Sequence, residues 1–254
     1  MKIFYNPPYH DGKPLAGQCL DFMPSDSQER FLDLCQVEEY REYFHKQGWL
    51  EPGAISYKIN SYGFRCDEFG GKDCIVTLGC SFTMGIGLPV QDTWPQLLGK
   101  KLQITPYNLA WGGAAADTCF RLAEYWLPAL RPKAVFMLTP PPSRFELIKA
   151  QQHPPVEVYM PSNSGDDSTR DIGSFLQHWY TMDENSRLNN TKNKLAIRAL
   201  CDKLNLPCLI YDAFSHMSKS REEVGYARDR MHAGPLAHTN LVERMFNDWH
   251  EKYA

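Results

Sequence analysis

The sequence predicts an α/β protein in which a parallel central sheet is covered by helices on both faces. Short apolar runs alternate with longer amphipathic segments, which is the pattern of strand–helix–strand units. The run at residues 134–138 is apolar throughout, as expected for a strand that is covered on both faces. The other expected strands are residues 74–79, 104–109 and 208–211, and helices are expected from residue 93 and over residues 117–130, 194–204 and 235–249.

Two regions lie outside this alternation. The first 70 residues are rich in Pro, Gly and aromatic side chains, and we expect an N-terminal extension (residues 1–70) that packs on a main domain of residues 71–254. One helix is expected in it, over residues 27–46, where apolar side chains recur at helical spacing. Residues 146–190 have no convincing period, so we expect a lid or insertion there that covers the active site. Within it, Asn189-Asn190-Thr191 is expected in a polar loop that leads into a helix.

The composition argues against several classes of protein. The 254 residues are 43% hydrophobic and 22% charged, which is ordinary for a soluble globular chain. A net charge of −3 argues against a nucleic-acid surface, and no apolar run approaches the ~20 residues that span a bilayer. The N-terminus shows no signal peptide, so we expect a cytoplasmic protein. Its eight cysteines form no Cys-x-x-Cys pair, and most are expected to be buried thiols rather than disulfides or zinc ligands.

Residues with nucleophilic and acid–base chemistry follow the expected strands. Ser81 comes directly after the first strand of the alternation, and Asp229 and His232 share a loop before the last helix. The carboxyl ends of parallel strands are where such sheets bind ligands, so these side chains are expected to meet. A serine is a weak nucleophile unless a base takes its proton, and a carboxylate fixes the tautomer of a histidine base. Each residue alone has an ordinary structural interpretation, and their order at the element ends carries the prediction.

The chain from about residue 74 to residue 249 resembles the SGNH, or GDSL-like, hydrolase superfamily. The blocks that carry the resemblance are Gly79-Cys80-Ser81-Phe82-Thr83, Trp94-Pro95, Asn108-Leu109-Ala110-Trp111-Gly112-Gly113, Asp229-Arg230-Met231-His232-Ala233-Gly234 with the later His238, and the lead-in Asn60-Ser61-Tyr62-Gly63-Phe64-Arg65. The resemblance implies a three-layer α/β/α, flavodoxin-like fold and ester hydrolysis without a metal or organic cofactor. By position it makes Ser81 the nucleophile, His232 the general base and Asp229 its orienting partner. The backbone N–H groups of Ser81 and Gly113 would face the oxyanion.

Two departures from the family pattern matter. Cys80 stands where the first block usually has aspartate, and we expect its side chain to point away from Ser81. The third block usually supplies an asparagine to the oxyanion hole, but residues 139–146 read Thr-Pro-Pro-Pro-Ser-Arg-Phe-Glu. Three prolines should hold this loop stiffly extended, and Ser143 or Arg144 is expected as the third donor. The alternative is that Arg144 pairs with a structural carboxylate, Glu146 or Asp67.

The sequence therefore favours a serine esterase that acts on a small ester, with an O-acyl carbohydrate as the substrate class suggested by the family. Trp111, Trp179 and Tyr180 are the expected apolar walls of its substrate site. The missing asparagine favours a second hypothesis, a catalytically weak or inactive binding protein that keeps the fold. A structural or assembly protein is the third class.

Overall fold

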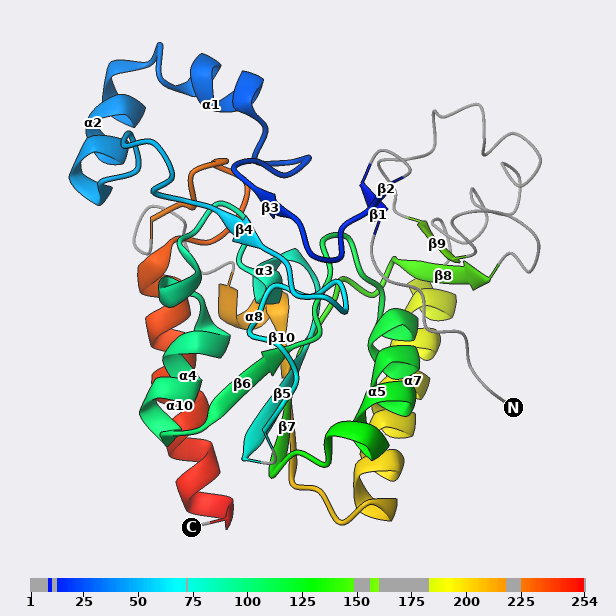
Figure 1. Ribbon diagram of the computed structural model, residues 1–254. Helices are drawn as coiled ribbons and strands as arrows, with labels where there is room; N and C mark the ends of the chain where they lie inside the picture. Colours follow the sequence, from blue (N-terminus) through cyan, green and yellow to red (C-terminus); the bar gives the residue numbers. More distant parts are fainter. Residues whose placement is uncertain are drawn as a thin grey trace.

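The computed structural model describes residues 9–10, 13–71, 73–148, 156–159, 183–217 and 225–253. Within these residues, four parallel strands form the central sheet in the order β10-β7-β5-β6 (Figure 1). In chain order this is 2-1-3-4, the order of the flavodoxin-like sheet. The predicted fold class is confirmed. The strands are β5 (Cys74–Leu78), β6 (Thr105–Asn108), β7 (Ala134–Thr139) and β10 (Cys208–Asp212).

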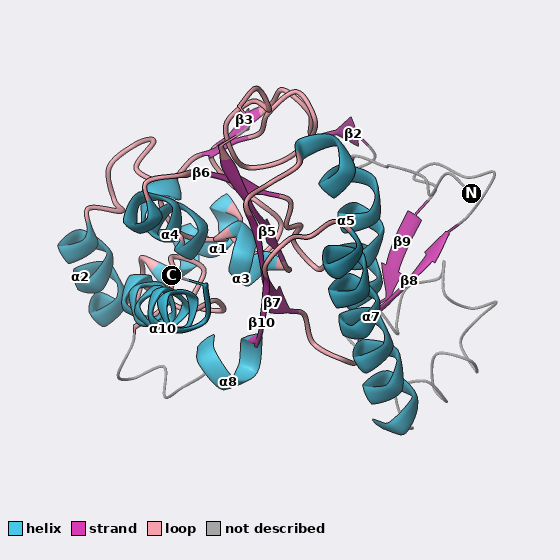
Figure 2. Cartoon of the chain, turned by 90° about the horizontal axis from the view of Figure 1, so that it is seen from below, coloured by secondary structure: helices cyan, strands magenta, loops and turns pink. Residues whose placement is uncertain are grey.

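Helices cover both faces of the sheet and make a three-layer molecule, as Figure 2 shows from below. Side chains alternate along β7, so Phe136 and Leu138 pack toward α4 and α10, and Val135 and Met137 pack toward α5 and α7. Both faces are therefore apolar, which explains the unbroken hydrophobic run in the sequence. The helices are α4 (Trp94–Leu102) and α10 (Pro235–Tyr253) on one face, and α5 (Ala116–Leu130) and α7 (Asp183–Lys203) on the other.

The N-terminal segment lies above the carboxyl ends of the strands (Figure 1). The single helix expected over residues 27–46 is instead two helices, separated at Cys35–Val37. In an unbroken helix Phe31 and Phe44 would point in widely different directions, because thirteen residues make roughly 3.6 turns. The break brings their rings to 5.8 Å in one apolar cluster. The elements are β1 (Tyr9–His10), β2 (Lys13–Pro14), β3 (Cys19–Leu20), α1 (Gln28–Leu34), α2 (Glu38–Gln47) and β4 (Tyr57–Lys58).

Helix α7 begins earlier than the sequence suggests. The expected polar loop at Asn189 is wrong, since the helix already starts at Asp183. The buried side chains of Asn189 and Asn193 each donate a hydrogen bond of 3.0 Å to the carboxylate of Asp117, at the start of α5. This half of the helix packs through amide–carboxylate contacts, so it lacks the apolar period by which helices are recognised.

The expected insertion at residues 146–190 is described in part. Strands β8 (Phe145–Ile148) and β9 (Val156–Tyr159) form an antiparallel hairpin, and β8 packs against α5. Trp179 and Tyr180 lie outside the described residues. The remaining short elements are α3 (Ser81–Met84), the 3-10 helix η1 (Val90–Asp92) and α8 (Ala213–Met217).

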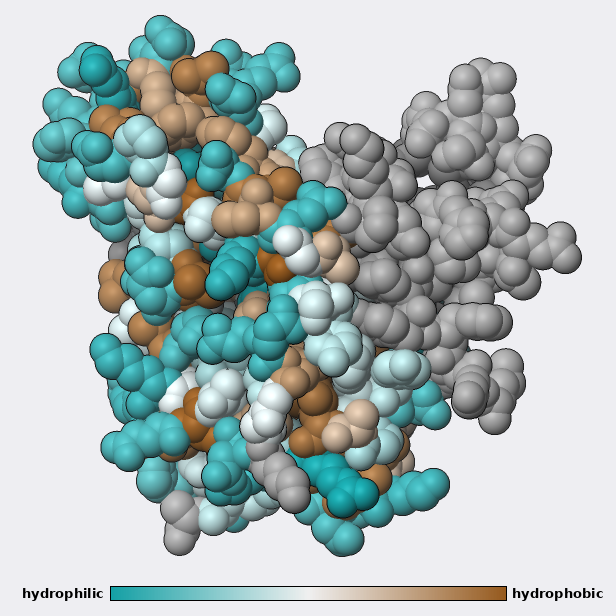
Figure 3. Space-filling view, viewed as in Figure 1, coloured by the Kyte–Doolittle hydropathy of each residue, from teal (hydrophilic) through white to brown (hydrophobic). Residues whose placement is uncertain are grey.

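Hydrophilic and apolar side chains are intermingled on the face shown in Figure 3. All eight cysteines fall in the described part of the chain and are free thiols, as expected. Four of them are buried, three are half-buried and Cys19 is exposed, so fewer are buried than the sequence suggests. Among the described residues, no helix combines the length and apolar character needed to cross a membrane.

Candidate active site

Ser81 sits in a tight turn between β5 and α3. Gly79 makes this turn possible, because a Cβ there would lie 2.1 Å from Thr83 Oγ1 and 2.9 Å from the Leu138 carbonyl oxygen. Ser81 is the first residue of α3, at the carboxyl end of β5, and it is 7% exposed. The Ser81 hydroxyl group therefore lies at the sheet edge where α/β proteins bind their ligands.

Asp229 and His232 form a buried pair in the loop before α10. Asp229 Oδ2 lies 2.5 Å from His232 Nδ1, and its Oδ1 accepts the backbone N–H groups of Met231 and His232, both at 3.0 Å. Burial disfavours the ionised carboxyl, but the hydrogen bond and charge of His232 and the two N–H groups outweigh it, so the pKa of Asp229 lies below its ordinary value. A carboxylate in this position can hold the proton on Nδ1 of a histidine, an arrangement in which Nε2 can act as a base.

The loop with this pair packs on the segment that carries Ser81. The rings of Phe82 and His232 meet edge to face with centroids 5.1 Å apart. The N–H of Arg228 donates to the carbonyl of Gly87 at 2.9 Å, and a Cβ on Gly87 would lie only 3.0 Å from that nitrogen. Ser81 and His232 therefore lie at the same edge of the sheet.

Cys80 directly precedes Ser81, and its side chain is fully buried. Burial raises the pKa of the Cys119 thiol in α5, and the neighbouring Cys80 adds to that shift. The expectation that the Cys80 side chain points away from Ser81 stays a prediction.

His238, the second histidine of the last block, has a structural contact. Its Nδ1 accepts the backbone N–H of Trp94 at 2.9 Å, at the start of α4. Burial, together with the charge of His232, lowers the pKa of His238 to about 3. The imidazole is therefore neutral near pH 7, where it ties α10 to α4 as a hydrogen-bond acceptor.

Asn108 connects the second sequence block to α3 by hydrogen bonds. Its Nδ2 donates to the Thr83 carbonyl at 2.9 Å, and its Oδ1 accepts from Thr77 Oγ1 at 3.1 Å and from the Ala110 N–H at 3.2 Å. The sequence blocks include this asparagine but do not reveal these contacts. Gly113 follows in the left-handed conformation, at φ 79°.

Trp111, an expected wall of the substrate site, packs mainly into the core. Its ring centroid is 6.3 Å from that of Phe64, and the guanidinium carbon of Arg121 is 5.4 Å from its centroid. The side chain is half-buried among the aromatic residues that cover α5. Its expected contact with substrate stays a prediction.

The proline-rich loop after β7 differs from the expectation. It is a turn rather than an extended segment, because the N–H of Arg144 donates back to the Pro141 carbonyl at 3.2 Å. Nη1 of Arg144 donates to the Ala114 carbonyl at 3.3 Å, next to Gly113. The expected alternative of an Arg144–Glu146 pair is wrong, since Glu146 is buried against Arg121 at 2.6 Å. Ser143 is half-buried within the turn.

The lead-in at residues 60–65 supports the turn that follows Ser81. The buried guanidinium of Arg65 donates to the carbonyls of Gly85 and Leu88 at 2.6 and 2.8 Å, and to that of Ser56 at 2.7 Å. Burial lowers the pKa of Arg65 to about 10, so it is still charged near pH 7. Arg65 thus connects the N-terminal segment to the turn that follows α3.

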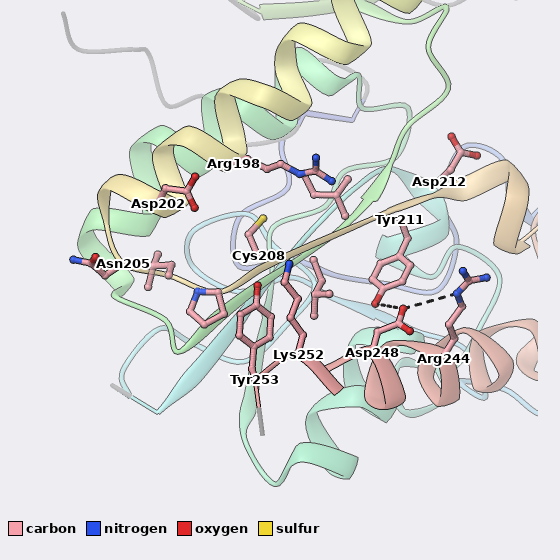
Figure 4. A pocket seen from close by; sticks show the side chains of 14 residues that line it. Arg198, Asp202, Asn205, Cys208, Tyr211, Asp212, Arg244, Asp248, Lys252 and Tyr253 are labelled. Carbon is pink, nitrogen blue, oxygen red and sulfur yellow. Dashed lines mark hydrogen bonds and ion pairs between the residues drawn. The ribbon is translucent and has the colours of Figure 1, made fainter. Parts of the chain in front are cut away.

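A hollow of about 910 Å³ runs along the outer edge of β10, away from this site (Figure 4). Tyr211 donates to Asp248 at 2.9 Å there, and Arg244 lies 3.9 Å from the same carboxylate. None of Ser81, Asp229 or His232 lines it. Ser81, Asp229 and His232 therefore place the candidate site at the carboxyl ends of β5 and β7, and the hollow on β10 is a separate feature.

The chain is similar in fold to esterases and lipases of the SGNH and GDSL-like type. The psychrotrophic esterase EstA from Pseudoalteromonas sp. is 12% identical, with 70% of this chain and 97% of that chain covered and a TM-score of 0.40. A family two carbohydrate esterase from Clostridium thermocellum is 13% identical, with 71% and 64% covered and a TM-score of 0.39. A GDSL-like lipase from Bacteroides thetaiotaomicron is 8% identical, with 84% and 97% covered and a TM-score of 0.34.

No family model and no curated protein matches the sequence. Identities this low and TM-scores below 0.5 say nothing about the reaction, which depends on the side chains of this chain.

Proposed function

We propose that this protein is a serine esterase that hydrolyses a small ester. The observation that carries the proposal is the buried Asp229–His232 pair, 2.5 Å between Oδ2 and Nδ1, on the sheet edge that bears Ser81. A histidine with a structural role can be satisfied by one neutral backbone donor, as the bond from the Trp94 N–H to His238 shows. An ionised aspartate, fixed by two backbone N–H groups and held against Nδ1, is the arrangement that a general base requires.

In the acylation half-reaction, Ser81 Oγ attacks the ester carbonyl and its proton passes to Nε2 of His232. The tetrahedral intermediate carries its negative charge on the former carbonyl oxygen. The backbone N–H groups of Ser81 and Gly113 are the proposed donors to that oxygen, with Arg144 or Ser143 as a third. The carbon–alkoxide bond then breaks, and the alcohol leaves with the proton from His232.

In the deacylation half-reaction, His232 takes a proton from water, and the hydroxide attacks the acyl–Ser81 carbonyl. The bond to Ser81 Oγ breaks, the oxygen regains its proton from His232, and a carboxylic acid is released. Asp229 stays ionised throughout and stabilises the imidazolium in both halves. The residues of this chain supply every proton transfer in the cycle.

The substrate class is an ester of a small acyl group, and O-acyl carbohydrates are the first class to test. Arg144 donates to the Ala114 carbonyl, and this contact places it beside the second block. A positive charge there suits a transition state that develops negative charge.

The direct test is hydrolysis of p-nitrophenyl acetate by the wild-type chain and by Ser81→Ala and His232→Ala. Both variants should lose activity by about 10⁴-fold or more, because either loss removes the nucleophile–base unit. Ser215→Ala is the matched control, since Ser215 lies exposed in α8 and bonds to Asp212. Activity that survives in Ser81→Ala would overturn the proposal.

The competing proposal is a binding protein that has lost turnover. The observation that favours it is the third block, where a proline turn replaces the usual asparagine donor. It predicts saturable binding of an acylated carbohydrate, unchanged by Ser81→Ala, with no release of acid. Acid release by the wild-type chain would exclude it.

A further inference from the structure

A buried charge network joins the N-terminal segment to the loop of the acid–base pair. Arg228, the neighbour of Asp229, directs its guanidinium away from His232 and into that segment. Its Nε donates to Asp26 Oδ1 at 2.9 Å and its Nη2 donates to Asp26 Oδ2 at 2.7 Å and to the Asp21 carbonyl at 2.8 Å. Asp26 is 1% exposed and Arg228 4% exposed, so the ion pair is shielded from water.

The same carboxylate reaches the segment of the nucleophile. Asp26 Oδ2 accepts the hydroxyl of Tyr57 at 2.6 Å, and that hydroxyl oxygen accepts the N–H of Gly87 at 2.7 Å. Gly87 lies in the turn that continues from α3, six positions after Ser81. Asp26 is therefore linked on one side to the residue before Asp229 and on the other, through Tyr57, to the turn after the nucleophile.

Two further hydrogen bonds connect the N-terminal segment to the loop of Asp229 and His232. Nε of Arg30, in α1, donates to the backbone carbonyl of Asp229 at 2.7 Å. Tyr43 in α2 donates to the Tyr226 carbonyl at 2.8 Å, at the start of the same loop. Both side chains come from the N-terminal segment, so the loop that carries the acid–base pair is held along its length by residues from outside the central sheet.

The energetics point to positioning rather than to net stability. Burying two charges costs free energy, and a buried ion pair often stabilises no better than apolar residues of similar volume. Desolvation raises the pKa of the Asp26 carboxyl in spite of Arg228 and Tyr57, which is the sign of that cost. What such a pair supplies is geometry, because its bidentate hydrogen bonds fix both partners in one orientation.

We infer that Asp26, with Arg228 and Tyr57, is a positioning device that sets the placement of His232 relative to Ser81. This inference rests on the proposed esterase function. Ser81 and His232 come from opposite ends of the main domain's sequence, and their segments make direct contact through Phe82 and Gly87. The network adds hydrogen bonds that connect the N-terminal segment to both of these segments. A misplacement of about 1 Å can cost about 10²-fold in rate, so these hydrogen bonds matter for turnover.

The experiment compares Tyr57→Phe with Tyr211→Phe. Each exchange removes one hydroxyl and keeps the ring. Tyr57 bonds to Asp26 and Gly87, whereas Tyr211 bonds to Asp248 beside the distant hollow on β10. Steady-state hydrolysis of p-nitrophenyl acetate is measured well below the melting temperature of each protein. We expect Tyr57→Phe to lower kcat roughly tenfold or more, with KM changed less than about twofold, because a positioned base acts in the transition state. Tyr211→Phe should leave both constants unchanged.

Arg30→Met provides an independent arm, because Arg30 is half-buried at the periphery and its loss does not strand a buried charge. It should also lower kcat without raising KM. The double variant Tyr57→Phe with Arg228→Lys should lose no more kcat than the worse single variant, since both act on one network.

Three results separate the failure of this inference from that of the proposed function. If the wild-type chain hydrolyses the ester and Tyr57→Phe and Arg30→Met match its kcat, the positioning role is wrong while the esterase stands. A fall in kcat that follows the melting temperature equally in Tyr57→Phe and Tyr211→Phe would also overturn the positioning role. If the wild-type chain and Ser81→Ala are equally inactive, the esterase proposal itself has failed.

Discussion

The two loops that flank the candidate active site are held in different ways. The loop of Asp229 and His232 is bound to the N-terminal segment by hydrogen bonds of 2.7–2.9 Å, from Arg30 and Tyr43 of that segment and from Arg228 of the loop to Asp26. In the turn after β7, Nη1 of Arg144 donates to the Ala114 carbonyl at 3.3 Å. The bonds that reach the loop of Asp229 and His232 are shorter than this contact, and they come from a segment far away in the sequence.

This difference bears on the proposed chemistry, because a general base and an oxyanion hole differ in how strictly their groups must be placed. A general base works only in one orientation, so it needs a rigid support. An oxyanion hole can keep part of its effect with two donors, since loss of one costs about 10²–10³-fold rather than everything. We therefore expect the largest effects in the loop of Asp229 and His232.

The largest effect is expected at Asp229. Asp229→Asn should lower kcat by about 10⁴-fold near pH 7, because an amide no longer fixes the proton on Nδ1 of His232. The measurement is p-nitrophenyl acetate hydrolysis, with the near-ultraviolet circular dichroism spectrum as the check that the loop still packs. A loss below about tenfold would show that Asp229 is a turn residue only.

A smaller effect is expected in the turn after β7. Arg144→Ala should lower kcat by about 10–100-fold with little change in KM, because its contribution arises mainly in the transition state. Ser143→Ala and Arg144→Lys are the comparison variants, and the donor is whichever side chain gives the larger loss. An unchanged kcat in both alanine variants would mean that the site works with two donors or takes the third from elsewhere.

The next prediction concerns His238, which fastens the helix after the acid–base loop. Its folded pKa of about 3 lies below the ordinary value, so between roughly pH 3 and 6.5 the unfolded chain binds a proton that the folded chain does not. Its contribution to the free energy of unfolding is complete above about pH 6.5 and falls as the solution is acidified toward the folded pKa.

Urea unfolding at neutral and mildly acidic pH tests this sign. Between about pH 7 and pH 5.5 the wild-type chain should lose about 1 kcal/mol more than His238→Asn, which keeps an acceptor for the Trp94 N–H but does not titrate. Equal losses in the two proteins would contradict a neutral, buried His238.

The smallest effect is expected at Cys80. Cys80→Ala should keep kcat within about threefold, because the buried thiol is expected to point away from Ser81, and the melting temperature should fall slightly through the lost buried contacts. Hydrolysis and thermal unfolding are measured on the same preparation. Abolished activity with an unchanged melting temperature would assign the chemistry to the thiol.

Local sequence signals predicted the parts of the molecule that depend on local patterns. The central strands follow from apolar runs such as residues 134–138, and Asp229 with His232 follows from a short spacing within one loop. Helix α7 was missed in its first half because Asn189 and Asn193 pack through hydrogen bonds instead of apolar contacts. The turn after β7 was expected to be extended, since three prolines restrict φ but do not forbid the Arg144–Pro141 hydrogen bond that closes it.

The Asp26–Arg228 pair could not be predicted in this way. Its members stand far apart in the sequence, and neither has a neighbour pattern that marks it as buried. Only the fold brings α1, β4 and the acid–base loop together above α3. The sequence thus indicates which residues carry the proposed chemistry, while the structure is needed to show what holds them in place.

The most direct test of the proposed serine chemistry is reaction with a fluorophosphonate probe, read by intact mass and by mapping the modified peptide. The serine oxygen displaces fluoride at phosphorus, so labelling needs an activated nucleophile but no knowledge of the natural ester. We expect one adduct on Ser81 in the wild-type chain, none in Ser81→Ala, and much slower labelling in His232→Ala. A wild-type chain that stays unmodified, or an adduct that maps to another residue, would contradict the account.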